Sequence, residues 1–241
     1  MNVRILLAAL LAGVLGGVFA TAAQSVKVVP LIMAAEQYEA GTAASDSHSP
    51  GTTQHDTSGH DHGSAPAGDR PGLERIALTT VSNILVGVAF SLLLTAGVLI
   101  TNQGMDFRSG LAWGLAGFVT FVLAPNLGLP PELPGTVAAD LQARQIWWLV
   151  TVVCTAAGLG IFAFLRNPLL MVAGISLIVA PHLYGAPQPD QHGSLAPASL
   201  TAEFVVASIA TAFAYWIFLG GVLGWLLERA SKREGMDGRA A

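Results

Sequence analysis

The sequence predicts an all-α membrane protein, a polytopic bundle of about six transmembrane helices. Three observations support this fold class: long apolar stretches without a charged residue, a low overall charge content, and an uneven distribution of basic residues between the loops. Charged residues make up 11% and apolar residues 53% of the 241-residue chain, whereas soluble domains usually carry about 25% charged residues. We therefore treat residues 1–241 as a single membrane domain.

The apolar stretches are the predicted spans. A helix needs about 20 residues to cross the hydrocarbon core of a bilayer. Five stretches reach that length comfortably, while the fifth in chain order is shorter and is also compatible with a re-entrant or tilted half-span. The six stretches are Ile5–Ala23, Ile76–Ile100, Leu111–Leu129, Ile146–Leu165, Pro168–Tyr184 and Phe204–Leu227.

The first stretch has two interpretations. Arg4, the apolar run and the small residues at its end also fit a cleavable signal peptide. Apolar residues continue beyond Ala23, which favours a retained helix. Gly13 and Gly17 form a G-x-x-x-G pair, which allows close packing of membrane helices. Gly110 with Gly114, and Gly220 with Gly224, repeat the spacing, and we expect all three pairs to lie at helix interfaces.

Charged residues predict the orientation. With six spans, seven of the eleven basic residues and four of the fifteen acidic ones fall on the side that holds both termini. The positive-inside rule places that side in the cytoplasm. A five-span model would move the C-terminal tail to the other side and break this sorting. The outer side then carries eleven carboxylates and all six histidines, a surface that attracts cations rather than nucleic acid.

Residues 41–72 form a polar segment that we expect to be a disordered outer loop. The segment is rich in Gly, Ser, Asp and His and has almost no large apolar side chain, so it cannot bury enough surface to fold alone. Short His-rich tracts often bind divalent metal ions. We interpret the loop as a metal-capture segment, the alternative being a solvated linker whose histidines are incidental. Its candidate ligands are His48, His55, His60 and His62.

Further candidate ligands lie in the other outer segments. His182 ends the fifth predicted span, and His192 follows in a Pro/Gly-rich loop. Among the outer carboxylates, Asp140 and Glu203 each have a structural explanation besides metal binding, whereas Glu132 has no evident partner. Asp140 is spaced i, i+4 from Arg144 and is expected to pair with it, whereas Glu203 is favoured by the dipole of the helix that it begins. The metal-site prediction places His182, Glu132, Asp140 and Glu203 together on the outer side.

Enzymatic motifs are missing from the sequence. The chain has no Walker A motif, no serine nucleophile elbow and no H-E-x-x-H. No charged residue lies in the middle of a predicted span, which argues against a proton-relay pump. We expect a protein that is not an enzyme and has no firmly implied cofactor.

Several motifs are spread nearly end to end along the chain. They include Glu36-x-Tyr38-Glu39, the Leu-Pro-Pro-Glu-Leu-Pro-Gly segment at 129–135, Ala143-Arg144-Gln145-x-Trp147-Trp148 and Pro181-His182-x-x-Gly185-Ala186-Pro187. Together they resemble the CbtA family of proposed cobalt transporter subunits. That family is usually described with five spans, whereas the charge distribution here favours six.

The resemblance implies a permease subunit of the bacterial inner membrane that takes up Co²⁺, or Ni²⁺, and works with a small single-span, His-containing subunit called CbtB. The expected path begins with capture at the His-rich loop and continues to His182, with a carboxylate from Glu132, Asp140 or Glu203. Ligand chemistry alone does not select cobalt over nickel, copper or zinc. The alternative is a non-transporting membrane subunit that binds metal, or a scaffold, within a larger complex.

Overall fold

A computed structural model describes residues 3–46, 72–165, 167–191 and 193–240. These residues form helices and connecting segments, and the described ranges contain no strand. The elements are α1 (Val3–Lys27), α2 (Val29–Asp46), α3 (Gly72–Thr101), α4 (Phe107–Phe118), a π-helical segment η2 (Val119–Leu123), α5 (Ala124–Asn126), α6 (Leu141–Phe164), α7 (Pro168–Tyr184) and α8 (Ala198–Ala240).

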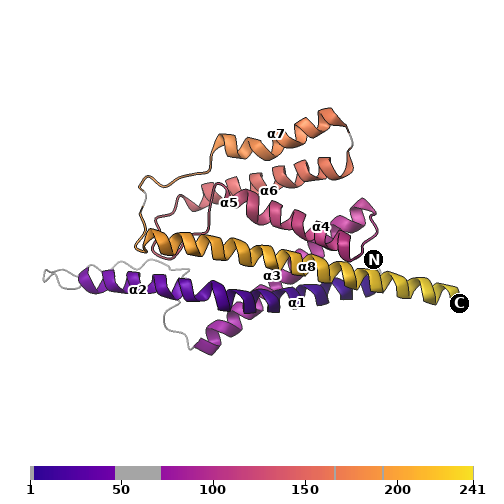
Figure 1. Cartoon of the computed structure of the whole chain (residues 1–241), viewed down its shortest axis with the longest axis horizontal. Coiled ribbons are helices and arrows are strands. Elements are labelled where there is room, and N and C mark those ends of the chain that lie inside the picture. Colours follow the sequence, from indigo (N-terminus) through magenta and orange to yellow (C-terminus); the bar gives the residue numbers. More distant parts are fainter. Residues whose placement is uncertain (1–2, 47–71, 166, 192, 241) are drawn as a thin grey trace, which may run out of the picture.

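The helices run back and forth along one direction, with both termini at the same end of the bundle (Figure 1). We call this the termini end. The opposite end, where α2 and the segments 127–140 and 185–197 lie, is the loop end. Five helices are long and apolar enough to span a membrane, and α7 adds a shorter apolar pass of 17 residues. The all-helical, polytopic fold is therefore confirmed, and the short helix is the fifth predicted stretch, Pro168–Tyr184.

The predicted disordered loop, residues 41–72, is helical at both of its ends. Helix α2 includes residues 41–46, since Ala40, Ala43 and Ala44 have high helix propensity, and Gly72 begins α3. The rest of that loop, residues 47–71, lies outside the described residues, and with it the predicted ligands His48, His55, His60 and His62. The bounds of α7 coincide with the predicted stretch Pro168–Tyr184.

Helix α1 packs on α3 through glycine. A Cβ atom at Gly13 would overlap the backbone of Val88, and one at Gly17 would overlap the backbone of Ile84. The same close approach lets Ser91 Oγ donate a buried 2.7 Å hydrogen bond to the carbonyl oxygen of Ala9. The predicted packing role of the Gly13–Gly17 pair is confirmed.

The other two predicted glycine pairs pack against each other. A Cβ atom at Gly110 of α4 would overlap the carbonyl oxygen of Gly220 of α8, and one at Gly220 would overlap the carbonyl oxygen of Gly110. Gly114 and Gly224 continue the contact in either direction along the interface. In lipid, where no hydrophobic effect drives helices together, such close approach of backbones supplies the dispersion contacts that hold them.

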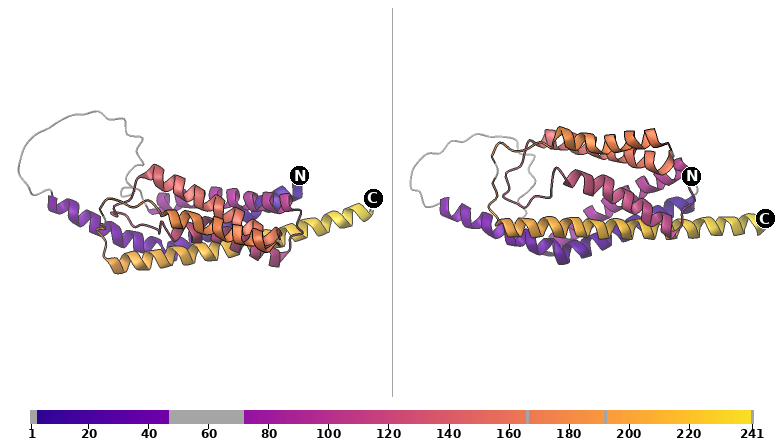
Figure 2. Two further views of the ribbon diagram at one scale, coloured as in Figure 1. Left: turned by 90° about the horizontal axis from the view of Figure 1, so that it is seen from above. Right: turned by 45° about the horizontal axis from the view of Figure 1, so that its top comes forward.

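Helices α6 and α7 form a hairpin at the edge of the bundle (Figure 1 and the right view of Figure 2). Gly158 of α6 lies against Gly174 and Ile178 of α7, an interface that the sequence analysis did not single out. Much of the remaining surface of α7 is exposed and apolar, including Leu169 and Leu183. This face suits contact with lipid tails.

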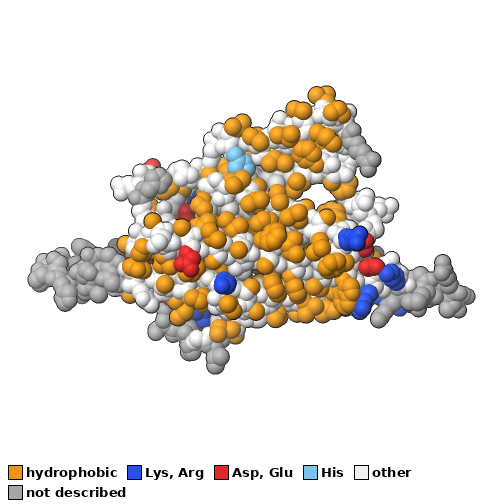
Figure 3. Space-filling view, viewed as in Figure 1, with side chains coloured by type: hydrophobic (Ala, Val, Ile, Leu, Met, Phe, Trp, Pro, Cys, Tyr) orange, Lys and Arg blue, Asp and Glu red, His pale blue; other side chains and the backbone are white. Residues whose placement is uncertain are grey.

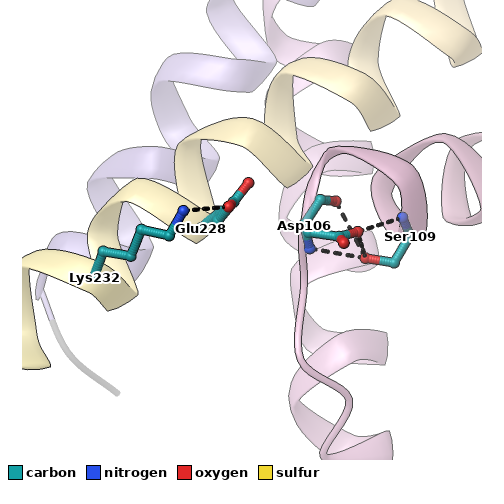
Figure 4. Close-up of polar contacts among 4 residues, drawn as sticks. All are labelled: Asp106, Ser109, Glu228 and Lys232. Carbon is teal, nitrogen blue, oxygen red and sulfur yellow. Dashed lines mark hydrogen bonds and ion pairs between the residues drawn. The ribbon is translucent and has the colours of Figure 1, made fainter.

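Charged side chains on the visible face gather towards its two ends, with hydrophobic side chains between them (Figure 3). At the termini end, Asp106 caps α4: its Oδ1 accepts a 2.8 Å hydrogen bond from the backbone N–H of Ser109, and the Ser109 hydroxyl oxygen accepts one from the Asp106 N–H (Figure 4). The bonds that the Ser109 N–H and, next, the Ser109 hydroxyl donate to the Asp106 carboxylate lower the pKa of this carboxyl group. Lys232 and Glu228 form an ion pair on the adjacent α8.

Replacing a packed glycine with alanine should destabilise the bundle, whereas the same change in open space should not. G220A would press a methyl group onto the Gly110 carbonyl, and overpacking of this kind costs about 1–3 kcal/mol. G160A places the methyl group in α6 with nothing within 4 Å, and there alanine should be neutral or stabilise by up to about 1 kcal/mol. Thermal melting in detergent should show a lower Tm for G220A only; equal Tm values would contradict this packing.

Candidate metal-handling site at the loop end

A groove of about 730 Å³ opens at the loop end. Its walls are segment 128–139, segment 187–198, the beginning of α6 and the first turns of α8. Most of the lining is apolar or proline, and its charged residues among the described part of the chain are Glu132 and Arg144. The two charges of the groove therefore come from the proline-rich segment, which holds Glu132, and from the start of α6, which holds Arg144.

Two anchors hold the segments around the groove. An isolated antiparallel bridge joins Thr136 to Ser194, with Val137 N–H donating to the Gly193 carbonyl oxygen at 2.9 Å. Leu133, only 3% exposed, is buried in a cluster with Ala35, Ala196 and Phe204. Helices α2 and α8 thus clamp the Leu-Pro-Pro-Glu-Leu-Pro-Gly segment.

The carboxylates beside the groove are paired differently from the prediction. Arg144 Nη2 lies 2.8 Å from Glu132 Oε2, with both side chains less than a third exposed. Asp140 instead caps α6, where its Oδ1 accepts a 2.8 Å hydrogen bond from the Ala143 N–H. The expected Asp140–Arg144 pair is wrong, because the Asp140 side chain caps the first turn of α6 and so points towards the backbone. Glu132, for which the sequence suggested no partner, pairs with Arg144 instead.

His182 lies at the end of α7 between two backbone carbonyls. Its Nδ1 is 3.0 Å from the Ile178 carbonyl oxygen and its Nε2 is 3.0 Å from the Ala124 carbonyl oxygen. The ring contacts the edge of Trp147, whose indole N–H donates to the Pro181 carbonyl oxygen at 3.1 Å. A neutral imidazole has a single N–H, so it can donate to only one of the two carbonyls at a time.

The Ala124 carbonyl lies where the third pass is irregular and ends, and it also accepts a 3.2 Å hydrogen bond from the Leu127 N–H. In η2 the hydrogen bonds widen to i→i+5, and Ala124 N–H donates to the Val119 carbonyl oxygen. Pro125 follows and has no N–H to donate, and the helix ends shortly afterwards at Asn126. Single π-helical turns often mark functional sites. Here the irregularity places a helix-terminal carbonyl against His182, which ties α7 to the third pass.

Four of the predicted ligands lie in the part of the chain that the structure describes, and they do not form one cluster: His182, Glu132, Asp140 and Glu203. Among the described residues, no three His, Cys, Asp or Glu side chains are grouped so that they could hold a metal ion. Glu203 lies exposed in the first turns of α8 and is not among the lining residues of the groove. His192 lies outside the described residues. Metal binding by these residues remains a prediction.

Sequence reasoning missed two charged residues at this end of the bundle. Glu39 of α2 lies beside Gly135, whose positive φ of 74° suits glycine. Glu36 pairs with Arg75 at 2.9 Å and fastens α2 to α3. The only signal for them was their place in a motif, because the partners are distant in sequence.

Comparison with known proteins gives one match. A family model described as "Probable cobalt transporter subunit (CbtA)" matches residues 2–228 and so covers every pass of the bundle. No curated protein and no solved structure matches the chain.

Two substitutions at Asp140 should separate capping from ion pairing. Asp140→Ala removes the cap of α6 and should cost about 1 kcal/mol, seen as a lower Tm in detergent. Asp140→Asn keeps the capping oxygen but removes the charge, and it should melt close to the wild-type protein. If Asn destabilised the protein as much as Ala, the charge would matter more than the cap.

Proposed function

Because the chain belongs to the CbtA family of probable cobalt transporter subunits, we propose that it moves Co²⁺ across the bacterial inner membrane as the permease subunit, with Ni²⁺ as a second cargo. The observation that carries this proposal is the family match over residues 2–228 of a polytopic helical bundle. The loop end faces outward and both termini lie in the cytoplasm, as the excess of basic residues at the termini end favours.

Capture begins at the outer surface. The side that we assign to the outside carries eleven carboxylates against four basic residues, and this excess raises the local concentration of cations. The His-rich loop, with His48, His55, His60 and His62, then supplies imidazole ligands. Its affinity is moderate, so that the ion can be released inward.

His182 receives the ion next. A metal ion binds the lone pair of a neutral imidazole nitrogen, and a hydrogen bond from the other nitrogen to a carbonyl fixes the orientation of the ring. The bond from Nδ1 to Ile178 can stay, while Nε2 leaves the Ala124 carbonyl to bind the ion. Loading of His182 is therefore coupled to release of α7 from the third pass.

A carboxylate completes this site. Glu132 would have to exchange its ion pair with Arg144, and Asp140 would have to give up the α6 cap. Glu203 is exposed and has no partner among the described residues, so its recruitment costs least. His192, which lies between His182 and Glu203 in the sequence, provides a further imidazole.

A second function, a non-transporting subunit that hands metal to a partner, is favoured by two observations. The described residues contain no ready cluster of three ligands, and the family description is that of a subunit. In that case the missing ligands come from a small single-span subunit of the CbtB type. Uptake by this chain alone would argue against this alternative.

Radioactive Co²⁺ uptake tests the proposal in cells that lack their own cobalt importers. The chain should confer uptake, with or without its small partner, and His182→Ala should reduce it about tenfold or more, since loss of metal-site groups typically costs 10–100-fold. Tyr184→Ala, at a 90% exposed position two residues away, is the matched control and should leave uptake unchanged.

Replacing the four loop histidines with asparagine tests capture separately. Uptake at low Co²⁺ concentration should fall, while uptake at saturating Co²⁺ should stay close to wild type because capture only concentrates the ion. Absence of uptake in every combination, with the protein confirmed in the membrane, would refute the permease and leave the binding-subunit function.

A further inference from the structure

A second cavity, of about 260 Å³, lies between α1, α3 and α8, with Val122 of η2 on its wall. It shares no lining residue with the groove at the loop end. Most of its lining is apolar, and no charged side chain of the described residues lines it. Val86, a lining residue on α3, is 49% exposed, so the cavity opens to the outside of the bundle at this side chain.

The cavity is long and narrow. On α8 it reaches from Ser208 to Trp216, a stretch that rises about 12 Å along the helix axis. Spread over that length, the 260 Å³ gives an average width of about 5 Å, against about 10 Å for an α-helix with its side chains. Carbon atoms in contact lie about 4 Å apart, so one hydrocarbon chain fits, whereas a helix of a partner protein does not.

Its depth matches one leaflet of a bilayer. Ser208 lies one turn inside the apolar stretch Phe204–Leu227, and Trp216 lies near the middle of that stretch. Half of the hydrocarbon core is about 15 Å thick, so the cavity extends from near the interface at the loop end to the centre of the membrane. The medium around its opening is therefore lipid.

The two ends of the cavity differ in polarity. Gln24, Asn83 and Ser208 line the end nearer to the loops. Asn83 donates from Nδ2 to Gln24 Oε1 at 2.9 Å, which leaves the NH₂ group of Gln24 free to donate. At the other end, Phe90 and Tyr215 line the cavity and pack on Trp216, with ring centroids 4.8 and 5.8 Å apart. The cavity thus has an amide mouth and an aromatic floor.

Lys27 lies just beyond the amide mouth. It follows Gln24 by three residues of α1, a rise of about 4.5 Å, and precedes the lining residue Val28. Its side chain is exposed and has no carboxylate partner among the described residues. The flexible stem of a lysine lets its ammonium group reach the level of lipid headgroups.

The other described basic residues of the loop end are neutralised. Arg75 pairs with Glu36, and Arg144 pairs with Glu132. Lys27 is therefore the cation of this end, within the described ranges, that is available to an anionic group from outside the chain.

We propose that the cavity holds one acyl chain of a phospholipid from the leaflet at the loop end, with the lipid phosphate on Lys27. The chain lies along the apolar walls and ends on the aromatic floor, and an ester carbonyl accepts a hydrogen bond from the Gln24 amide. An apolar cavity of about 150 Å³ stays dry and binds benzene, so hydrocarbon rather than water is the guest expected in this larger one. The bound chain fills the space that α3 and α8 leave between them where both pack on α1.

Native mass spectrometry of the full chain in detergent, titrated with phosphatidylglycerol, tests the phosphate contact. The first phosphatidylglycerol should bind more tightly than diacylglycerol with the same chains, which lacks the phosphate. Lys27→Gln should weaken phosphatidylglycerol binding about fivefold, the effect of one basic residue near a membrane surface, and should leave diacylglycerol binding unchanged. Lys27→Arg keeps the charge and should bind like the wild type.

A substitution inside the cavity tests the chain contact. Ala212 lines the cavity, and Ala212→Leu adds three carbon atoms that displace part of the guest, so binding of both lipids should fall at least about tenfold. Ala210→Leu, at an exposed position of the same helix outside the lining, is the matched control and should bind like the wild type. Equal Tm values without lipid show that both variants fold, and the Lys27 variants decide the phosphate contact in either case.

Two results would overturn the site. Equal lipid binding by folded Ala212→Leu and Ala210→Leu would place the chain elsewhere. Equal binding of the two lipids by the wild type, unchanged in Lys27→Gln, would exclude a phosphate on Lys27. These measurements need no metal ion, so their outcome is independent of the proposed transport function.

Fluorescence of Trp216 gives a check in which the wild-type cavity is intact. Bromine atoms on an acyl chain quench tryptophan emission on contact. Trp216 is 2% exposed, so a chain of the surrounding lipid touches it only from within the cavity. The emission that Trp216→Phe removes in ordinary phosphatidylglycerol should be largely missing in brominated phosphatidylglycerol, and an equal loss of emission in both lipids would contradict an acyl chain on the aromatic floor.

Discussion

Close approach of helix backbones through glycine is the constraint on which the bundle depends. Three interfaces, α1 with α3, α4 with α8 and α6 with α7, have glycines at positions where a Cβ atom would meet backbone of the neighbouring helix. Lipid tails are as apolar as the side chains, so burial alone does not hold helices together. The same approach places α8 next to α1 at Gly16 and Leu219, which shapes the membrane-depth cavity between them.

Departures from regular helix account for the polar features at the loop end. The π-helical segment and Pro125 end the third pass early and present the Ala124 carbonyl to His182. The proline-rich segment that follows is folded back by Leu133 and Gly135, so that Glu132 reaches Arg144. Each break in helical hydrogen bonding thus accompanies a contact with another pass.

The chain separates charged from neutral polar groups. Described carboxylates and basic side chains lie at the ends of the bundle, while amides and hydroxyls lie at membrane depth. A charged side chain is costly in the hydrocarbon core, whereas amides and hydroxyls can satisfy their hydrogen bonds within the bundle, so this distribution suits a bundle that spans a membrane.

Hydropathy, charge and glycine spacing, which are local properties, were enough to predict the helical class, both termini at one end and the glycine interfaces, while the structure has five helices long enough to span a membrane and one shorter apolar helix. Motif resemblance identified the family. The partners of Arg144 and Glu132, the capping role of Asp140, the two carbonyls at His182 and the cavity at Tyr215 were decided only by the tertiary structure. These contacts join residues from different passes, or choose between competing local bonds, and helix packing rather than spacing along the chain determines which of them form.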